Sequence, residues 1–240
     1  MKNIIVTDWS TCSTGDPLTV WPDGCRDLIV CIEPMQHPKI FLTGLDTTAY
    51  CVKVPTNTFF FGIRLAPGSV AVWEKGEPTS CRNLLELHQH RLFSTSLFQK
   101  ISKYPEKASD LLVETVEEWF KPINSITKEF FDAINHSDGQ IPLLTRSSRT
   151  LRRNIRSATG ASPQFWLGLR RVRKSAYDIV FSDTPLVDIA LSAGYSDQAH
   201  LTREMRRWLG LTPAALRREA EKYKHMVTLP NAFSTLSVMG

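Results

Sequence analysis

The chain has 240 residues, of which 42% are hydrophobic and 22% are charged, a balance typical of a soluble globular protein. No apolar run approaches the roughly 18 residues that a membrane-spanning helix needs. Charged and polar residues follow the first residues too soon for a secretory signal. We therefore expect a cytoplasmic protein that does not enter a membrane, long enough for one large domain or two ordinary ones.

Charge is divided unevenly along the chain. Residues 1–140 hold 13 Lys and Arg against 17 Asp and Glu, and residues 141–240 hold 16 against 7, so the two parts carry −4 and +9 within a total of +5. A basic second part predicts a polyanionic partner, of which nucleic acid is the common one. The alternative is a basic solvated surface with no partner.

All five cysteines lie in the acidic part, at Cys12, Cys25, Cys31, Cys51 and Cys81. Their odd number and the lack of a Cys-x-x-Cys pair do not fit a disulfide framework. The few histidines nearby do not have metal-ligand spacing either. We expect reduced, mostly buried thiols, and neither a metal ion nor a cofactor.

Residues 1–80 alternate between short apolar runs and turn residues. The runs are IIVTDW, DLIVCI, IFLTG, YCVKV and FFFGIRL, separated by Pro, Gly, Asp and Asn. This pattern predicts an all-β module, either a small barrel or a sandwich.

Residues 81–138 show the helical period, with apolar residues at i, i+3 and i+4. The segments concerned are CRNLLELHQHRLF, ASDLLVETVEEWFKPI and ITKEFFDAINH. We expect a helical connector, which could also pair two copies as a homodimer. At the other end, residues 225–240 show little pattern, and we expect Met226–Gly240 to form an irregular tail.

An internal repeat with an offset of 50 residues is the most informative feature of the chain. SSRTLRRNIRSATGASP (147–163) aligns with DQAHLTREMRRWLGLTP (197–213), so that a leucine, two arginines, a glycine and a proline recur. In each copy the apolar residues at i, i+4 and i+7 form one stripe of a helix, and the shared arginines lie about 140 to 200 degrees around the axis. Each copy thus predicts a helix with one packing face and one basic face, ended by Gly and followed by a Ser/Thr-Pro that opens the next helix.

The residues before the second copy complete a helix-turn-helix unit. Within PLVDIALSAGYSDQ we expect Pro185 near a helix start, Ile189, Ala190 and Ala193 facing inward, Gly194 at the turn and Ser196 as N-cap. In this motif the second helix enters the major groove of DNA.

A long helix over 164–181 is expected to join the two units. Its apolar face comprises Phe165, Leu169, Val172, Ala176 and Ile179. Two units joined in this way could place two recognition helices about 34 Å apart, in successive segments of the major groove.

Residues 139–224 resemble the DNA-binding domain of the AraC/XylS family. The motifs that carry the resemblance are SxRTLxRxIxxxTGxSPxxW and DIAxxxGYSDQAHLTRxxRRWxGxTPxxLR, which look like the double helix-turn-helix signature of that family. The resemblance implies a sequence-specific transcription factor without enzymatic activity. We expect double-stranded DNA as its partner, an activating role, and RNA polymerase as a further partner.

The resemblance also implies which residues contact DNA. The base-reading positions are Ser148, Arg149, Arg152 and Arg153 in the first helix, and Asp197, Gln198, His200 and Arg203 in the second. Arginine pairs with guanine and glutamine with adenine, each worth about 1–3 kcal/mol of discrimination. The positions further along, expected to contact phosphates, are Arg156, Arg206 and Arg207. The remaining large apolar residues, Trp166, Trp208 and Leu216, are expected in the core.

The first unit departs from the family pattern. The helix expected before Ser147 is represented only by GQIPLLTRS, which is shorter than usual and contains Pro142. This unit could therefore be incomplete.

The acidic part resembles, more weakly, the small N-terminal domain of one poorly characterised subgroup of the family, through WPDGCRDLIV, FLTG and FFFGIRLAPG. This resemblance implies a sensor or dimerisation module. For a small-molecule effector we expect a pocket formed by Trp21, Asp23, Cys25, Arg26, Phe60 and Arg64, with an arginine holding an anionic group.

Other interpretations of the acidic part stay open. The charged residues could form a structural Asp–Arg pair, since charges within a sheet must be paired or solvated. Cys25 and Cys31 could form a thiol switch in a redox-sensing regulator. An enzyme with Cys25 as nucleophile lacks an adjacent base, and a helical protein-binding adaptor is a third class of function.

Overall fold

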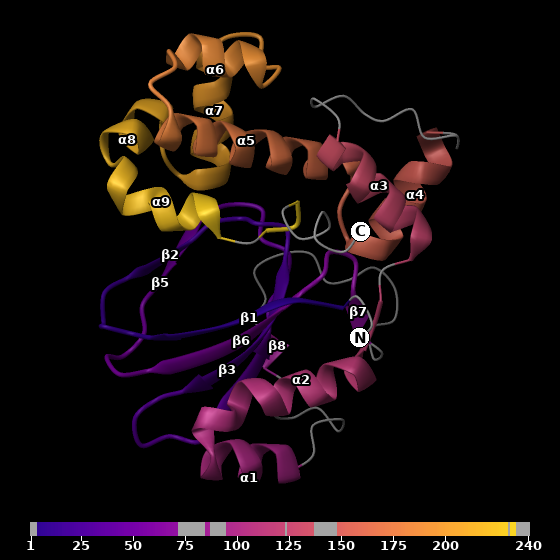
Figure 1. Cartoon of the computed structure of the whole chain (residues 1–240), viewed down its shortest axis with the longest axis vertical. Helices are drawn as coiled ribbons and strands as arrows, with labels where there is room; N and C mark the ends of the chain where they lie inside the picture. The colour runs from indigo at the N-terminus through magenta and orange to yellow at the C-terminus, as the bar shows by residue number, and fades with distance from the viewer. Residues whose placement is uncertain are drawn as a thin grey trace.

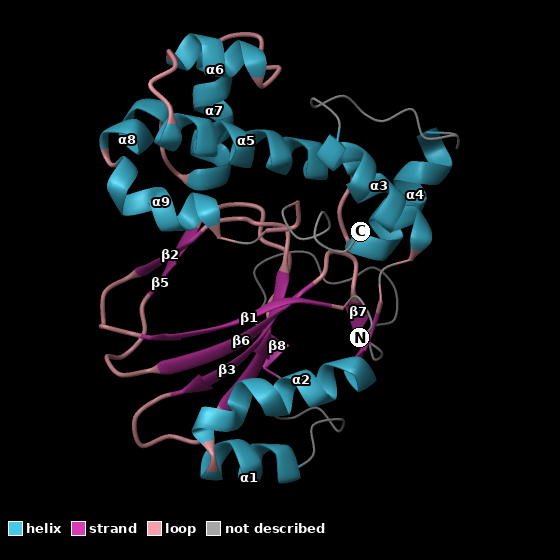
Figure 2. Cartoon of the chain, in the orientation of Figure 1, coloured by secondary structure: helices cyan, strands magenta, loops and turns pink. Residues whose placement is uncertain are grey.

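The computed structural model describes residues 4–71, 85–86, 95–122, 124–136, 148–229 and 231–233. Strands occupy the first part of the chain and helices the second, so the α+β class expected from the sequence is confirmed (Figure 2). The shortened helix expected before Ser147 and the fifth cysteine, Cys81, lie outside the described residues. Within those residues, no helix combines the length and the apolar character needed to cross a membrane.

A five-stranded antiparallel sheet forms the base of the N-terminal part. Its order is β1 (Ile5–Cys12), β6 (Phe59–Leu65), β3 (Arg26–Ile32), β4 (Lys39–Leu42) and β8 (Leu85–Glu86). Two small sheets accompany it: β2 (Leu18–Val20) with β5 (Tyr50–Val52), and β7 (Val70–Ala71) with β9 (Phe120–Lys121). Across the described ranges the edge strands β1 and β8 do not pair with each other, so the arrangement is sandwich-like and not a closed barrel.

One expected helix is replaced by a strand where the structure describes it. Leu85 and Glu86, within the helical pattern of CRNLLELHQHRLF, pair with Leu42 and Phe41 of β4. Main-chain pairing with an edge strand has overridden the local apolar period here. The other residues of that segment lie outside the described ranges.

Two helices, α1 (Thr95–Lys103) and α2 (Ala108–Trp119), cover one face of the large sheet (Figure 1). A short 3-10 turn over Pro105–Lys107 joins them. Alternate residues of the central strands, Leu28 and Val30 in β3 and Ile63 and Leu65 in β6, share one buried core with the apolar face of α2. The apolar face of the strands, which repeats every two residues, therefore packs against the apolar face of the helix, which repeats every 3.6 residues.

The expected connector is divided between two cores. Its helices α1 and α2 belong to the sheet, whereas α3 (Ser125–His136) packs against the C-terminal helices through Phe130, Phe131 and Ile134. The Phe131 ring meets the Trp166 ring edge to face, with 4.8 Å between centroids. The physical reason is that each amphipathic segment has an apolar face that must be buried, and each finds a different partner.

The C-terminal part is all helical. It comprises α4 (Ser148–Thr159), α5 (Pro163–Phe181), α6 (Leu186–Ser192), α7 (Gln198–Leu209), α8 (Pro213–Arg218) and α9 (Ala220–Thr228). The five expected apolar residues of α5 are buried or packed against the core, and Trp166, Trp208 and Leu216 are buried as expected. This core holds α5 as a central rod against which the other helices pack (Figure 1).

The junctions that end each repeat copy are confirmed. Both glycines have positive φ, at 77° for Gly160 and 74° for Gly210. The hydroxyls of Ser162 and Thr212 then cap the next helix by accepting from main-chain N–H groups, and a proline follows each cap. The two repeat copies therefore share their helix-ending and helix-capping conformations as well as their sequence pattern.

The expected irregular tail is wrong for its first residues. Met226 and Val227 are buried in α9, and Ala232 lies in the same core. Their apolar side chains supply the reason, since α9 closes the helical core on the side that faces the N-terminal part. The indole of Trp21 stacks on the Tyr223 ring of α9 at 5.3 Å, which joins the two parts of the chain.

Candidate nucleic-acid interface

Helix α7 separates its apolar and basic residues onto opposite faces. Leu201, Met205 and Trp208 are fully or almost fully buried against the helical core. Arg203 and Arg206 are exposed on the other side. The exposed face is therefore free to meet a polyanion while the buried face fixes the helix.

The turn between α6 and α7 has the geometry of a helix-turn-helix unit. Ile189 and Ala190 of α6 are buried, and Gly194 has a φ of 77°. Among the described residues, nothing lies within 4 Å of where a Cβ of Gly194 would stand, so the backbone conformation and not space requires glycine. Tyr195 is then buried beneath the guanidinium of Arg171, which lies 5.3 Å from its ring.

Asp197, and not the expected Ser196, is the N-cap of α7. Its carboxylate accepts from the main-chain N–H of His200 at 2.6 Å. Ser196 precedes the cap and contacts the first turn of α7, with its hydroxyl 3.3 Å from Nδ1 of His200. The His200 ring also meets Tyr195 edge to face at 5.2 Å. Two of the four expected base-reading residues of α7 are thus engaged in shaping its first turn.

The cap should give this helix a pH dependence. The hydrogen bond from His200 N–H lowers the pKa of Asp197 below its usual value, so the stabilisation is complete above about pH 4 and is lost as pH falls through the lowered pKa. In thermal unfolding we expect the deficit of Asp197→Ala to be constant from neutral to mildly acidic pH and to shrink below about pH 4. Asp197→Asn keeps a neutral cap, so its deficit should be smaller than that of Asp197→Ala at every pH, and equal deficits of the two variants at neutral pH would contradict the assignment.

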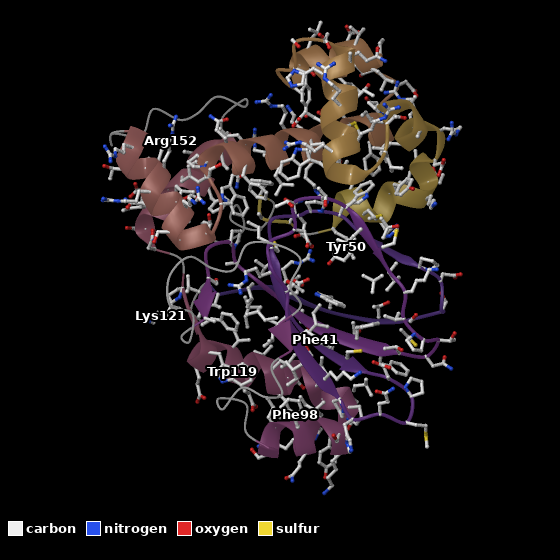
Figure 3. The ribbon with its side chains drawn as sticks, turned by 180° about the vertical axis from the view of Figure 1, so that it is seen from behind. Phe41, Tyr50, Phe98, Trp119, Lys121 and Arg152 are labelled. Atoms are coloured by element: carbon white, nitrogen blue, oxygen red, sulfur yellow. The ribbon has the colours of Figure 1, made fainter. Side chains whose placement is uncertain are left out.

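Helix α4 presents the same arrangement as α7. Leu151, Ile155 and Ala158 are buried. The exposed arginines are Arg149, Arg152, Arg153 and Arg156, with Arg152 labelled at the edge of the molecule in Figure 3. Thr159 anchors the end of α4 to α5, because its hydroxyl accepts from Trp166 Nε1 at 3.0 Å. Ser148 is the first residue of α4.

The three arginines expected to contact phosphates are not equivalent. Arg206 is exposed, whereas the guanidinium of Arg207 is paired with Glu204 at 2.8 Å and lies over the Trp208 ring at 4.7 Å. Glu204 also accepts from Trp208 Nε1 at 3.2 Å. Arg207 must therefore exchange a local partner for a phosphate, which makes it a weaker candidate than Arg206.

The structure adds Ala199, which sequence reasoning missed. It is exposed in the first turn of α7, four residues before Arg203, and thus on the same outward face. Gln198 is also exposed there. The repeat could have indicated this position, because Ala199 aligns with Arg149, but an alanine has no polar group that would suggest a contact with DNA.

The expected effector residues of the N-terminal part are only partly brought together. Arg64 donates through Nε and Nη2 to the two carboxylate oxygens of Asp27, at 3.0 and 2.9 Å. The same Nη2 lies 2.9 Å from Asp23. Asp27 and Arg64 are direct partners in the β3–β6 ladder, so the strand register creates the ion pair.

The other expected pocket residues have different surroundings. Arg26 donates to the main-chain oxygen of Thr43 at 3.2 Å. Phe60 lies four residues from Arg64 along β6, roughly 13 Å away. Trp21 and Cys25 are buried, but in the core shared with the C-terminal helices. The charged cluster therefore adjoins the junction between the two parts of the chain.

The cysteines differ from the expectation of mostly buried thiols. Cys25 and Cys31 are buried, while Cys12 and Cys51 on edge strands are exposed, and all four are free. Burial raises the pKa of Cys25, and burial together with Glu33 raises the pKa of Cys31 to about 11. A raised pKa disfavours the thiolate, which is the reactive form in a redox switch or a nucleophile.

A packed helix, a glycine turn and a second helix with an exposed basic face define a helix-turn-helix DNA-binding domain. Residues 143–219 match the sequence model of a family described as helix-turn-helix domain. The match shows that the C-terminal part contains a helix-turn-helix domain, and the double signature of the sequence resembles that of AraC/XylS regulators.

The relatives of the chain include two curated regulators of transcription. The HTH-type transcriptional regulator ExsA of Pseudomonas aeruginosa is 39% identical over 61 residues, which are 25% of this chain and 22% of ExsA. The HTH-type transcriptional activator RhaS of Escherichia coli is 32% identical over 88 residues, which are 37% of this chain and 31% of RhaS. The matched region spans less than a third of either relative. Among solved structures, ToxT of Vibrio cholerae aligns with 93% of this chain and 99% of its own, at 8% identity and a TM-score of 0.45.

Proposed function

We propose that the protein is a sequence-specific DNA-binding regulator of transcription that reads two successive segments of the major groove. The observation that carries the proposal is the repeat in its folded form, in which α4 and α7 each bury one face and expose arginines on the other. Both helices pack on α5, whose 19 residues span about 28 Å. That length is comparable with one turn of DNA, about 34 Å.

The proposed roles follow from position on each helix. Arg149 and Arg153 of α4, with Gln198 and Arg203 of α7, face outward in the N-terminal halves and suit contacts with base edges. Arg156 and Arg206 lie one turn further on and suit phosphates. Asp197 and His200 hold the first turn of α7 in shape, which makes them positioning residues in this proposal.

Selection from a random library of duplexes, followed by sequencing of the retained DNA, tests the proposal. We expect one enriched motif of two elements, and loss of enrichment in the double variant Arg153→Ala, Arg203→Ala. Enrichment that survives in this variant would mean that neither arginine reads DNA, and no retention of DNA by the wild type would favour a protein-binding adaptor. Retention of DNA without any motif would reduce the function to nonspecific binding.

Ala199 is expected to contact the C5 methyl group of a thymine. Replacing that thymine by deoxyuridine removes the methyl group and should weaken wild-type binding by about fourfold, from about 0.8 kcal/mol per buried methyl group. The variant Ala199→Gly should bind both duplexes equally. If every single thymine replacement has the same effect on the wild type and on this variant, Ala199 does not read DNA.

We further propose that the N-terminal part, which has its own core, is an effector-responsive module. We also propose that the protein acts in the cytoplasm as a homodimer. In this proposal it activates transcription in contact with RNA polymerase. The engagement of Arg64 by two carboxylates disfavours the expected role of this arginine as an anion holder. Screening metabolites for a shift in thermal unfolding of the full chain, with DNA affinity as second readout, tests effector binding. A redox-sensing role is disfavoured by the raised pKa values of Cys25 and Cys31.

A further inference from the structure

Arg173 is a buried cation in the middle of the helix that joins the two recognition helices. It retains only 7% of its accessible surface, and its guanidinium donates to the main-chain oxygen of Met226 in α9 at 3.1 Å. Burial lowers its pKa, yet an arginine stays protonated in a protein. One hydrogen bond to a carbonyl does not neutralise the charge, so a counter-charge is required nearby.

The counter-charge is supplied by Asp23, which belongs to the N-terminal part. The next residue, Gly24, packs against Leu169 of α5, one helical turn before Arg173, which places Asp23 within electrostatic range of the Arg173 guanidinium. Asp23 also lies 2.9 Å from Arg64. Its Oδ1 accepts from the main-chain N–H of Cys25 at 2.8 Å. With Asp27 the group holds two carboxylates and two guanidinium groups, so its charges balance only while the two parts of the chain are in contact.

Two apolar contacts and one main-chain hydrogen bond join the N-terminal part to three C-terminal helices. Trp21 stacks on Tyr223 of α9. A Cβ on Gly24, which has a φ of 78°, would stand 2.6 Å from the Trp166 ring of α5. The N–H of Ala49 donates to the main-chain oxygen of Trp208, near the C-terminal end of α7, at 2.8 Å. We name this contact region, formed by residues 21–25 and Ala49 with α5, α7 and α9, the interdomain joint.

The joint leaves the proposed reading surface free. It contacts α7 near the C-terminal end, whereas the residues assigned to bases lie in the first turns of α7. Figure 1 shows the strands below α5 and α9, and α6 on the far side of α5. Docking of the N-terminal part and binding of DNA through α7 are therefore compatible, because the joint contacts α7 away from its first turns.

We infer that Arg173 and Asp23 are positioning residues for DNA recognition: their charges across the interdomain joint fix α5, and with it the distance between α4 and α7. The inference rests on the proposed function. Loss of Asp23 leaves the charge of Arg173 without its counter-charge, so α5 must shift to bring the guanidinium to water. Such a shift changes the distance between α4 and α7 more than it changes the contacts that either helix makes with DNA.

Affinity for DNA of altered spacing tests the inference in the full chain. The probes are the duplex selected by the wild type and two derivatives in which the motif elements are one base pair closer or further apart. We expect Asp23→Asn to weaken binding to the selected duplex by about tenfold, within the usual range of coupling between sites, and to reduce its preference over both derivatives. Asp16→Asn, at an exposed aspartate, is the matched control and should change neither.

Rescue separates positioning from general damage. Because Arg173→Met removes the uncompensated cation, the double variant Asp23→Asn, Arg173→Met should recover part of the affinity and spacing preference lost in Asp23→Asn. Arg203→Ala should weaken binding without changing the spacing preference. If Arg173→Met does not fold by circular dichroism, Arg173→Lys, which keeps the charge, should retain the wild-type preference.

Each outcome decides between the two proposals. Unchanged spacing preference in Asp23→Asn, with binding retained, would overturn the inference and leave the proposed function intact. Absence of any enriched motif for the wild type would instead overturn the proposed function, on which the inference depends. A loss of affinity equal for all three spacings would assign Asp23 a merely structural role.

Discussion

Replacement of Arg203 by alanine is expected to weaken binding to the selected duplex by about 5- to 150-fold, the equivalent of about 1–3 kcal/mol for one arginine–guanine contact. Arg203 is exposed on the face of α7 opposite the buried Leu201, so the substitution removes no core contact. Fluorescence anisotropy at fixed salt concentration measures the loss. The variant should also tolerate other bases at one position of the motif, because the residue that discriminates there is gone.

Two matched arginine variants make this result specific. Arg218→Ala removes an exposed arginine that is paired with Glu219, and should leave affinity nearly unchanged. Arg206→Ala should weaken binding to all sequences alike and lower the salt slope by about one unit, as expected for a phosphate contact. A uniform loss across sequences in Arg203→Ala would mean that Arg203 holds the backbone and does not read.

Replacement of Arg64 by methionine is expected to destabilise the N-terminal part by about 3–5 kcal/mol, because it leaves Asp27 buried without its cation and Asp23 with Arg173 alone. Burial opposes the charge of Arg64, but Asp23 and Asp27 raise its pKa above the usual value. The side chains involved are only 12% to 18% exposed, so water screens them little. Urea unfolding followed by tryptophan fluorescence measures the change in the free energy of unfolding.

Lys39→Met is the matched control for this change. Lys39 pairs with Glu33 on the same sheet, but the two side chains are 35% and 21% exposed. For such a pair we expect a loss of about 0–1 kcal/mol. Equal effects of the two substitutions would show that the cluster around Arg64 contributes no more than a surface ion pair.

The sequence was sufficient to predict the recognition helices because their signal is local. Leu201, Met205 and Trp208 are spaced so that one stripe of the helix is buried. The glycine that ends each repeat copy adopts a positive φ, and the Ser/Thr-Pro after it starts the next helix. The central strands were predictable for the same reason, since their alternation of apolar residues matches one buried face. Local patterns therefore fixed the elements that present the arginines.

What the sequence could not predict depends on contacts between distant residues. The strand at Leu85 forms because β4 has an edge with which it can pair. Met226 and Ala232 are held in place by a core that includes Trp21. Arg173 has the appearance of a solvated arginine within a basic helix, and only the fold brings Asp23 to it. The choice of Asp197 over Ser196 as N-cap turns on one residue of helix register, which pattern alone does not fix.

Protection of guanine N7 from methylation on the selected duplex tests the central claim most directly, because N7 lies in the major groove where α4 and α7 are proposed to bind. We expect two protected clusters about one helical turn apart, with Arg153→Ala removing one and Arg203→Ala removing the other. A single protected cluster, or loss of both clusters in either variant, would contradict reading by two helices.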